Sequence, residues 1–86
     1  MDNKKKFLEL AKELLNEVNP VLIKEKGNDL VKLLSTVELT DGYTPQTRQQ
    51  ACDRLTSDID EYIKYGDSLK DVLRTSVYFL TTEAIK

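Results

Sequence analysis

The chain has 86 residues, of which 40% are apolar and 33% are charged, a composition typical of one small folded domain. Its net charge of −2 is nearly balanced and argues for neither nucleic acid nor an acidic substrate as a partner. No apolar run approaches the roughly 20 residues that span a bilayer. A single cysteine excludes an internal disulfide, and the lack of histidine argues against a structural zinc site.

The first segment of the chain predicts an amphipathic helix over 3–18. Its apolar residues recur at intervals of three and four, as one helical face requires: Phe7, Leu10, Ala11, Leu14, Leu15 and Val18. Asp2 or Asn3 is expected to cap this helix at its N-terminus. Asn19 and Pro20 end it, because proline disfavours the helical conformation of the residue before it.

A second helix is predicted over 20–38, with Asn19 as its N-cap and Pro20 at its first position. Gly27 and the two polar residues after it interrupt the pattern, and two interpretations compete. Either one helix contains the glycine, or a short turn ends at Lys26 and a new helix follows. The apolar residues keep one helical phase across the interruption, and a glycine costs only about 1 kcal/mol in a helix interior. The single helix, kinked or frayed at Gly27, is therefore favoured.

Thr44 and Pro45 predict the start of a third helix over 45–65, again as a cap residue followed by proline. Gly66 predicts its end in a left-handed conformation. The apolar residues of this helix form only a narrow seam: Ala51, Cys52, Leu55, Ile59, Tyr62 and Ile63. Most of its circumference is therefore expected to face water.

Residues 68–85 carry more apolar bulk than any comparable stretch, and we predict a fourth helix there. Its apolar stripe is wide, as suits a helix that contacts several neighbours, and includes Leu69, Val72, Leu73, Val77, Phe79, Leu80 and Ala84. Asp67 or Ser68 is expected to cap it, and Asp71, three residues after Ser68, resembles the acidic residue of a capping box. Residues 75–82 are also rich in strand formers, but no second candidate strand exists to pair with them.

Four helices joined by short connections predict an all-α fold, a small antiparallel four-helix bundle that forms a single domain over 1–86. Residues 10–15 read LAKELL, and residues 54–59 read RLTSDI ahead of a short turn and another apolar helix. In these segments the chain resembles the small cytosolic immunity proteins that protect producers of pediocin-like bacteriocins. The resemblance implies a four-helix bundle and an immunity role, and it transfers no functional residue to this chain.

No residue pattern predicts catalysis, a cofactor or a metal site. Cys52 has no histidine to act as its base, so we interpret it as a small buried side chain rather than a nucleophile. Asp58 and Glu61 lie one helical turn apart, as acid/base or divalent-metal pairs do, but this spacing is common on exposed helices. The expectation is a non-enzymatic protein.

The candidate site is an acidic face on the third helix, which we expect to bind another protein that has a basic surface. Its residues are Asp53, Asp58, Asp60 and Glu61, with Tyr62 and Tyr65 at one end as aromatic anchors. A merely solvated face is the alternative for the carboxylates, and core packing is the alternative for the tyrosines. An inhibitor or immunity-type role is the specific expectation.

A small DNA-binding or transcription-regulatory module is the alternative function. Arg48 and Arg54 stand among glutamines, a composition that reaches base edges, but the acidic residues that follow repel phosphates. Lys4, Lys5 and Lys6 predict at most weak contact with an anionic membrane surface, at about 1 kcal/mol per lysine. The glutamates after them rule out the apolar core of a signal peptide, so a cytoplasmic location is expected.

Overall fold

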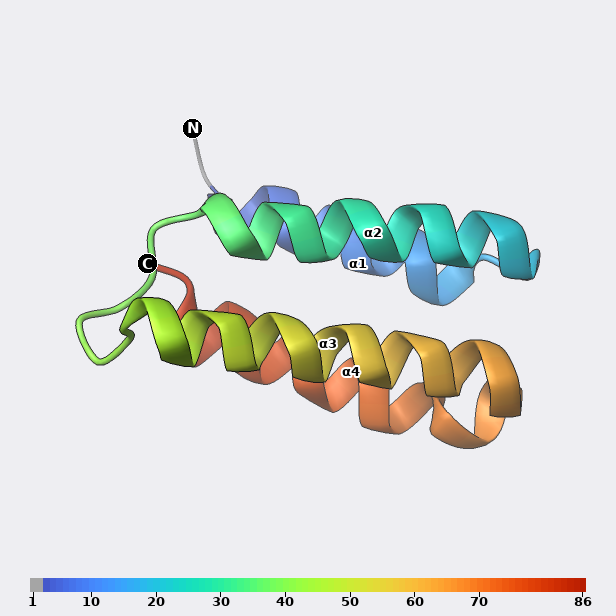
Figure 1. Ribbon diagram of the computed structural model, residues 1–86. Helices are drawn as coiled ribbons and strands as arrows, with labels where there is room; N and C mark the ends of the chain where they lie inside the picture. The colour runs from blue at the N-terminus through green and yellow to red at the C-terminus, as the bar shows by residue number, and fades with distance from the viewer. Residues whose placement is uncertain (1–2) are drawn as a thin grey trace.

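In the computed structural model, which describes residues 3–86, the chain is helical and packs around one core (Figure 1). Its elements in chain order are α1 (Asn3–Asn16), α2 (Pro20–Thr36), α3 (Pro45–Tyr65), the 3₁₀-helix η1 (Gly66–Leu69), α4 (Lys70–Phe79) and the π-helical turn η2 (Leu80–Ala84). The predicted all-α class is confirmed, and residues 75–82 are helical rather than extended. Within residues 3–86, the β-type pairing is limited to an isolated antiparallel bridge between Leu39 and Ile85.

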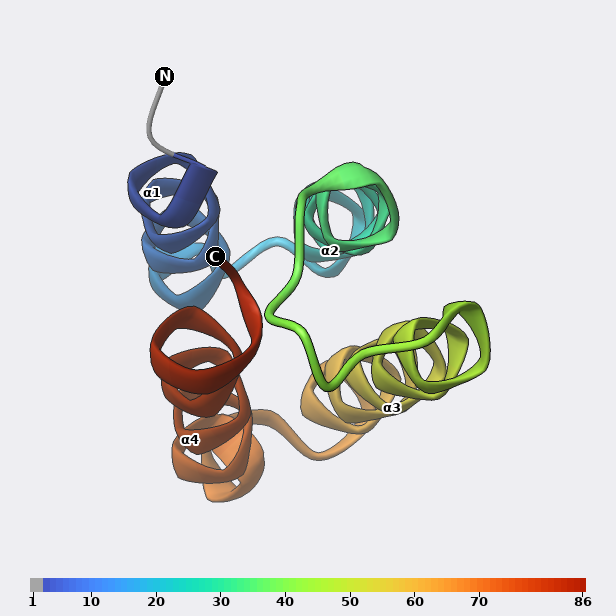
Figure 2. The ribbon, with the colours of Figure 1, turned by 90° about the vertical axis from the view of Figure 1, so that its left-hand side faces the viewer.

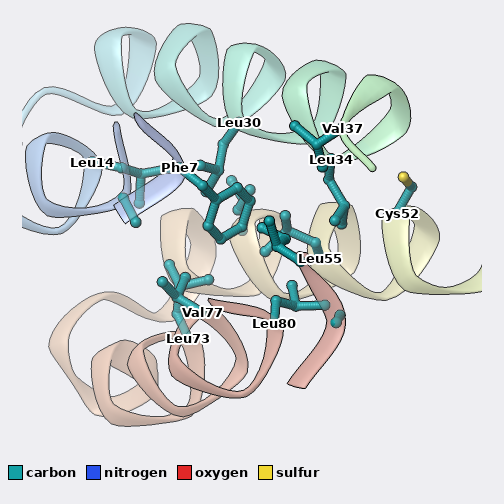
Figure 3. Packing of buried hydrophobic residues seen from close by; sticks show 14 of the residues in the cluster. Phe7, Leu14, Leu30, Leu34, Val37, Cys52, Leu55, Leu73, Val77 and Leu80 are labelled. Carbon is teal, nitrogen blue, oxygen red and sulfur yellow. The ribbon is translucent and has the colours of Figure 1, made fainter. Parts of the chain in front are cut away.

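The helices pack side by side around a shared apolar interior. Each one contacts its neighbour in sequence, and α4 returns to contact α1. Successive helices run in opposite directions (Figure 1), and a view along their axes shows the interior that they enclose (Figure 2). Fully buried side chains come from all of them: Phe7 from α1, Leu30 and Leu34 from α2, Leu55 from α3 and Leu73 from α4. Figure 3 shows Phe7 in the middle of this core.

The predicted starts of the second and third helices are confirmed. The Asn19 side chain accepts a hydrogen bond from the backbone N–H of Val21 at 2.9 Å, with proline at the first helical position. Thr44 accepts from the backbone N–H of Thr47 at 3.1 Å, and the Thr44 N–H donates back to the Thr47 hydroxyl at 2.7 Å. These reciprocal bonds satisfy donors that every helix start leaves without an intrahelical partner.

The first helix ends at Asn16, before the predicted residue 18, and Val18 is 89% exposed instead of facing the core. The Glu17 carboxylate ends the helix by accepting hydrogen bonds from the backbone N–H groups of Val18 and Asn19, at 3.1 and 3.3 Å. The bond from Asn19 is the main cause that lowers the pKa of the Glu17 carboxyl. The capping role predicted for Asp2 lies outside the described residues.

Gly27 lies inside α2, which runs through it as one continuous α-helix and ends at Thr36. The favoured single-helix interpretation is confirmed, and the glycine has a second role that its sequence context did not indicate. A Cβ atom at residue 27 would lie 2.8 Å from Cγ2 and 3.2 Å from Cδ1 of Ile59 on α3. The lack of a side chain at Gly27 therefore permits the close approach of α2 and α3.

Arg48 of α3 holds the C-terminal end of α2. Its Nη1 atom donates to the backbone carbonyl oxygens of Leu34 and Val37, at 2.9 and 2.7 Å. Carbonyls at the end of a helix lack intrahelical donors, and a guanidinium supplies strong, charge-assisted ones. Because Arg48 is half-buried, these bonds are partly shielded from water.

Arg48→Ala is expected to lower the free energy of unfolding by about 1–3 kcal/mol, because the two carbonyls lose their donor. Urea unfolding followed by circular dichroism measures this change. Arg54→Ala is the matched control, since Arg54 is exposed on the same helix, and its expected effect is within about 0.5 kcal/mol. Equal losses in the two variants would contradict a structural role for the bonds of Arg48.

The fourth predicted helix, over 68–85, is not one continuous α-helix, because the structure divides this segment among η1, α4 and η2. Within residues 3–86, three of the four predicted helices are therefore continuous. Gly66, at a φ of 70°, turns the chain into η1, and the positive φ expected there is confirmed. The predicted cap by Asp67 or Ser68 is wrong: Leu69 precedes α4 and makes no side-chain capping bond. Ser68 instead donates its hydroxyl hydrogen to the carbonyl oxygen of Tyr65 at 3.1 Å, within the turn.

At its other end this segment widens into η2 and returns to the loop before α3. The Ile85 N–H donates to the carbonyl oxygen of Leu80, five residues earlier, at 2.9 Å. The Thr40 N–H donates to the carbonyl oxygen of Ala84 at 2.8 Å, so the C-terminal segment is bound to the loop (Figure 2). The widened turn thereby places Ala84 and Ile85 in the core, where both are fully buried.

The buried stripe of α4 and η2 is narrower than predicted. Leu73, Val77 and Leu80 are buried, whereas Val72 is 46% and Phe79 is 54% exposed. At 3.6 residues per turn, these two residues lie about a third of a turn away from the buried row. The expectation that both pack into the core is therefore wrong, and two large apolar side chains are left at the surface.

Candidate partner-binding groove

The acidic residues predicted as one face are distributed around α3. Asp60 lies toward α2 and forms an ion pair with Lys24 at 2.9 Å. Asp53 accepts a hydrogen bond from the Gln49 side chain at 2.9 Å, and Glu61 is exposed. Two of these three exposed carboxylates are thus already engaged within the protein.

Asp58 lies on the opposite side of α3, toward α4. Its Oδ2 atom accepts a hydrogen bond from the Ser76 hydroxyl of α4 at 2.7 Å, and its side chain is half-buried. Asp58 is therefore half-buried instead of exposed as expected, although it lies one helical turn before the exposed Glu61. The bond instead connects α3 to α4 at the side of the molecule where Val72 and Phe79 are exposed.

The two predicted tyrosine anchors differ in their surroundings. Tyr62 is only 5% exposed and belongs to the core, so it does not present an anchor at the surface. Tyr65 is exposed at the end of α3, with the Lys64 ammonium 5.2 Å from the centroid of its ring. Tyr43, in the loop before α3, is half-buried and packs against the core. Core packing, the alternative interpretation, thus applies to Tyr62.

A groove lies between α3 and α4, and we call it the α3–α4 groove. Its volume is about 360 Å³ and most of its lining is apolar. The buried side chains of Leu55 and Leu80 form the floor, and the rim includes Tyr43, Phe79 and Arg54. Small-molecule sites are usually concave and mostly apolar, with a few polar groups and volumes in this range.

This groove was not predicted from the sequence, because Val72 and Phe79 were both assigned to the buried stripe of the last segment. Val72 and Phe79 are seven residues apart and share one helical face, which differs from the face of Leu73, Val77 and Leu80. The row of Val72 and Phe79 lies on a different face of the helix from the buried row, and this second apolar row is the signal that would have indicated an exposed patch.

Cys52 is buried, as predicted. Burial raises the pKa of its thiol, and the sulfur lies 4.0 Å from the carbonyl oxygen of Val31. A neutral, buried thiol is a poor nucleophile. Within residues 3–86, no group of three or more His, Cys, Asp or Glu side chains is arranged to hold a metal ion.

The basic residues considered for nucleic acid and membrane contact are also placed by the structure. Arg48 is one of the two arginines in the DNA-binding alternative, and its guanidinium donates hydrogen bonds to backbone carbonyls at the end of α2. At the start of α1, Lys5 and Lys6 are exposed and Lys4 is half-buried, and the weak membrane contact through these three lysines stays a prediction. Among residues 3–86, no helix combines the length and the apolarity needed to cross a membrane.

No protein family, curated protein or solved structure that we compared with the chain matches it.

Proposed function

We propose that the protein is a non-enzymatic module that binds a partner protein through the α3–α4 groove, in an inhibitor or immunity-type role. The observation that carries this proposal is the exposure of Phe79, 54% of which is in contact with water at the rim of an apolar groove. Aromatic side chains beside a concave apolar surface are typical anchors of protein interfaces. The immunity-type role rests in addition on the sequence resemblance.

The outer carboxylates have a secondary part in this proposal. Asp60 and Asp53 are engaged with Lys24 and Gln49, so their charge is partly compensated within the protein. The negative charge of Glu61, with the part of the Asp53 and Asp60 charges that is not compensated, would steer a partner with a basic surface toward the protein. These charges would raise the association rate and would not contact the partner in the groove.

The DNA-binding alternative is disfavoured by the position of Arg48. A base-reading arginine must be free to extend into a groove of the duplex. Arg48 donates to two carbonyls of α2 and is half-buried, so its removal from this site would break both bonds.

Site-specific photocrosslinking tests the proposal in cells of the natural host. A benzophenone amino acid replaces Phe79 in one variant and Tyr78 in another. Both residues are exposed on α4, but only Phe79 lines the groove, so Tyr78 is a matched control. We expect a discrete crosslinked protein from position 79 and none from position 78.

Two results would contradict the proposal. Crosslinking to the same proteins from both positions would indicate non-specific contact with the exposed surface. No crosslink from position 79, with the variant folded and expressed, would mean that the groove contacts no protein in the cell.

A further inference from the structure

The α3–α4 groove carries one positive and one negative side chain. Arg54 and Asp58 both line it and lie one turn apart on the same face of α3. Within residues 3–86, no ion pair includes either side chain. The Asp58 carboxylate accepts a hydrogen bond from the Ser76 hydroxyl at 2.7 Å, but a neutral hydroxyl leaves its charge uncompensated. An occupant that fits this groove must therefore match both charges.

Exposed apolar side chains of α4 flank the two charges. Phe79 is 54% and Val72 is 46% exposed, and Phe79 lines the groove together with the buried Leu55 and Leu80. A shallower hollow extends the groove toward Val72, and Arg54 lines both. Exposed apolar surface around a few charged groups is typical of a contact surface for another protein chain.

A second copy of the chain offers the two charges in the order that the groove requires. When a two-fold axis crosses α3 at a right angle between Arg54 and Asp58, the two α3 helices lie antiparallel and Arg54 of each copy faces Asp58 of the other. The same axis passes close to Phe79, because α4 runs antiparallel to α3 and Ser76 lies level with Asp58 (Figure 1). Each Phe79 then lies over the groove of the other copy.

We infer that the free protein forms a symmetric dimer through the α3–α4 groove, with reciprocal pairs between Arg54 and Asp58 and with Phe79 buried in the interface. Charge-assisted pairs fix the register of the two copies, and burial of the aromatic ring supplies affinity. Symmetric dimers of this kind are the commonest form of protein self-association. The dimer covers the groove, so a partner protein must displace the second copy, and this consequence rests on the proposed function.

Sedimentation velocity of the purified chain, over a concentration series up to the millimolar range, tests the inference. We expect a dimer population that rises with concentration. Arg54→Asp places like charges opposite each other at both contacts, as does Asp58→Lys, so each variant should associate about tenfold more weakly or worse. Phe79→Asp should also weaken the dimer. Arg74→Asp is the matched control and should behave like the wild type, because Arg74 is exposed on α4 and does not line the groove.

The two charge variants are expected to associate with each other when they are mixed. In the mixed pair, Arg54→Asp supplies the carboxylates and Asp58→Lys supplies the cations, so both contacts become attractive. The mixture should therefore form a dimer that neither variant forms alone. Circular dichroism verifies the fold of each variant, since Asp58→Lys loses the bond with Ser76. If that variant does not fold, Arg54→Asp and Phe79→Asp decide the test, because both change exposed side chains.

A wild-type chain that stays monomeric over the whole series would overturn the inference. So would a dimer that Arg54→Asp and Arg74→Asp weaken equally, or a mixture of the two folded charge variants that stays monomeric. These results are distinct from failure of the proposed function. A host protein crosslinked from position 79 would support a partner at the groove even for a monomeric chain, whereas crosslinks from position 79 that join only two copies would support the dimer and contradict the proposed function.

Discussion

Leu73→Ala and Leu55→Ala are each expected to lower the free energy of unfolding by about 2–5 kcal/mol. Leu73 on α4 and Leu55 on α3 are fully buried and point into the same core (Figure 3). Alanine removes apolar contacts and leaves a cavity that rigid neighbouring helices fill only in part. Urea unfolding followed by circular dichroism measures the loss, with an unchanged m-value as the sign that stability alone has changed.

Val18→Ala is the matched control for these two variants, because Val18 is a large aliphatic residue that is 89% exposed. Its expected effect is within about 0.5 kcal/mol. In a domain of this size, a loss of a few kcal/mol is a large part of the total stability, so either leucine variant is expected to be partly unfolded at 37 °C. Losses below about 1 kcal/mol at both leucines would contradict the packing described here.

Gly27→Val is expected to destabilise the protein by about 1–3 kcal/mol, as overpacked cores are. The first side-chain atom at residue 27 would already lie 2.8 Å from Cγ2 of Ile59, and valine adds two branches that cannot rotate away from α3. Gly42→Val is the control, because a Cβ atom at Gly42 meets nothing within 4 Å, and its expected effect is within about 0.5 kcal/mol.

The contact between Gly27 and Ile59 can be isolated with a double-mutant cycle. Ile59→Ala alone is expected to cost about 2–5 kcal/mol by opening a cavity. The same change also removes the atoms that a side chain at residue 27 would meet. The double variant should therefore lose less stability than the sum of the two single variants, by about 0.5–3 kcal/mol. Additive losses would mean that the cost of Gly27→Val arises elsewhere.

The helix starts could be predicted because their causes are local. Asn19 and Thr44 each accept a backbone hydrogen bond from a residue two or three positions later, and proline follows each of them. Both signals lie within a few consecutive residues. The end of α1 was predicted two residues too late, because the apolar pattern continues to Val18 whereas the hydrogen bonds that end the helix come from the Glu17 side chain. Apolar periodicity does not report such a side-chain bond.

The candidate site could be predicted only in part. The narrow buried seam of α3 correctly indicated that most of this helix faces water. Its exposed carboxylates were expected to act together, yet Asp58 lies in the α3–α4 groove with Ser76 and Asp60 lies beside Lys24. The surroundings of each carboxylate are set by a partner on another helix. Ser76 is 18 residues from Asp58 in the sequence, and Lys24 is 36 residues from Asp60.

The sequence by itself determined the all-helical class, the starts of α2 and α3 and the residues of the α3 seam, because caps and periodicity act over one or two helical turns. The tertiary structure alone decided that Phe79 is exposed, that Gly27 lies against Ile59 and that Arg54 has no partner within residues 3–86. An apolar side chain is buried only where another helix covers its face, and the relative rotation of two helices depends on the packing of the whole core. For that reason the α3–α4 groove was found only once the positions of both helices were known.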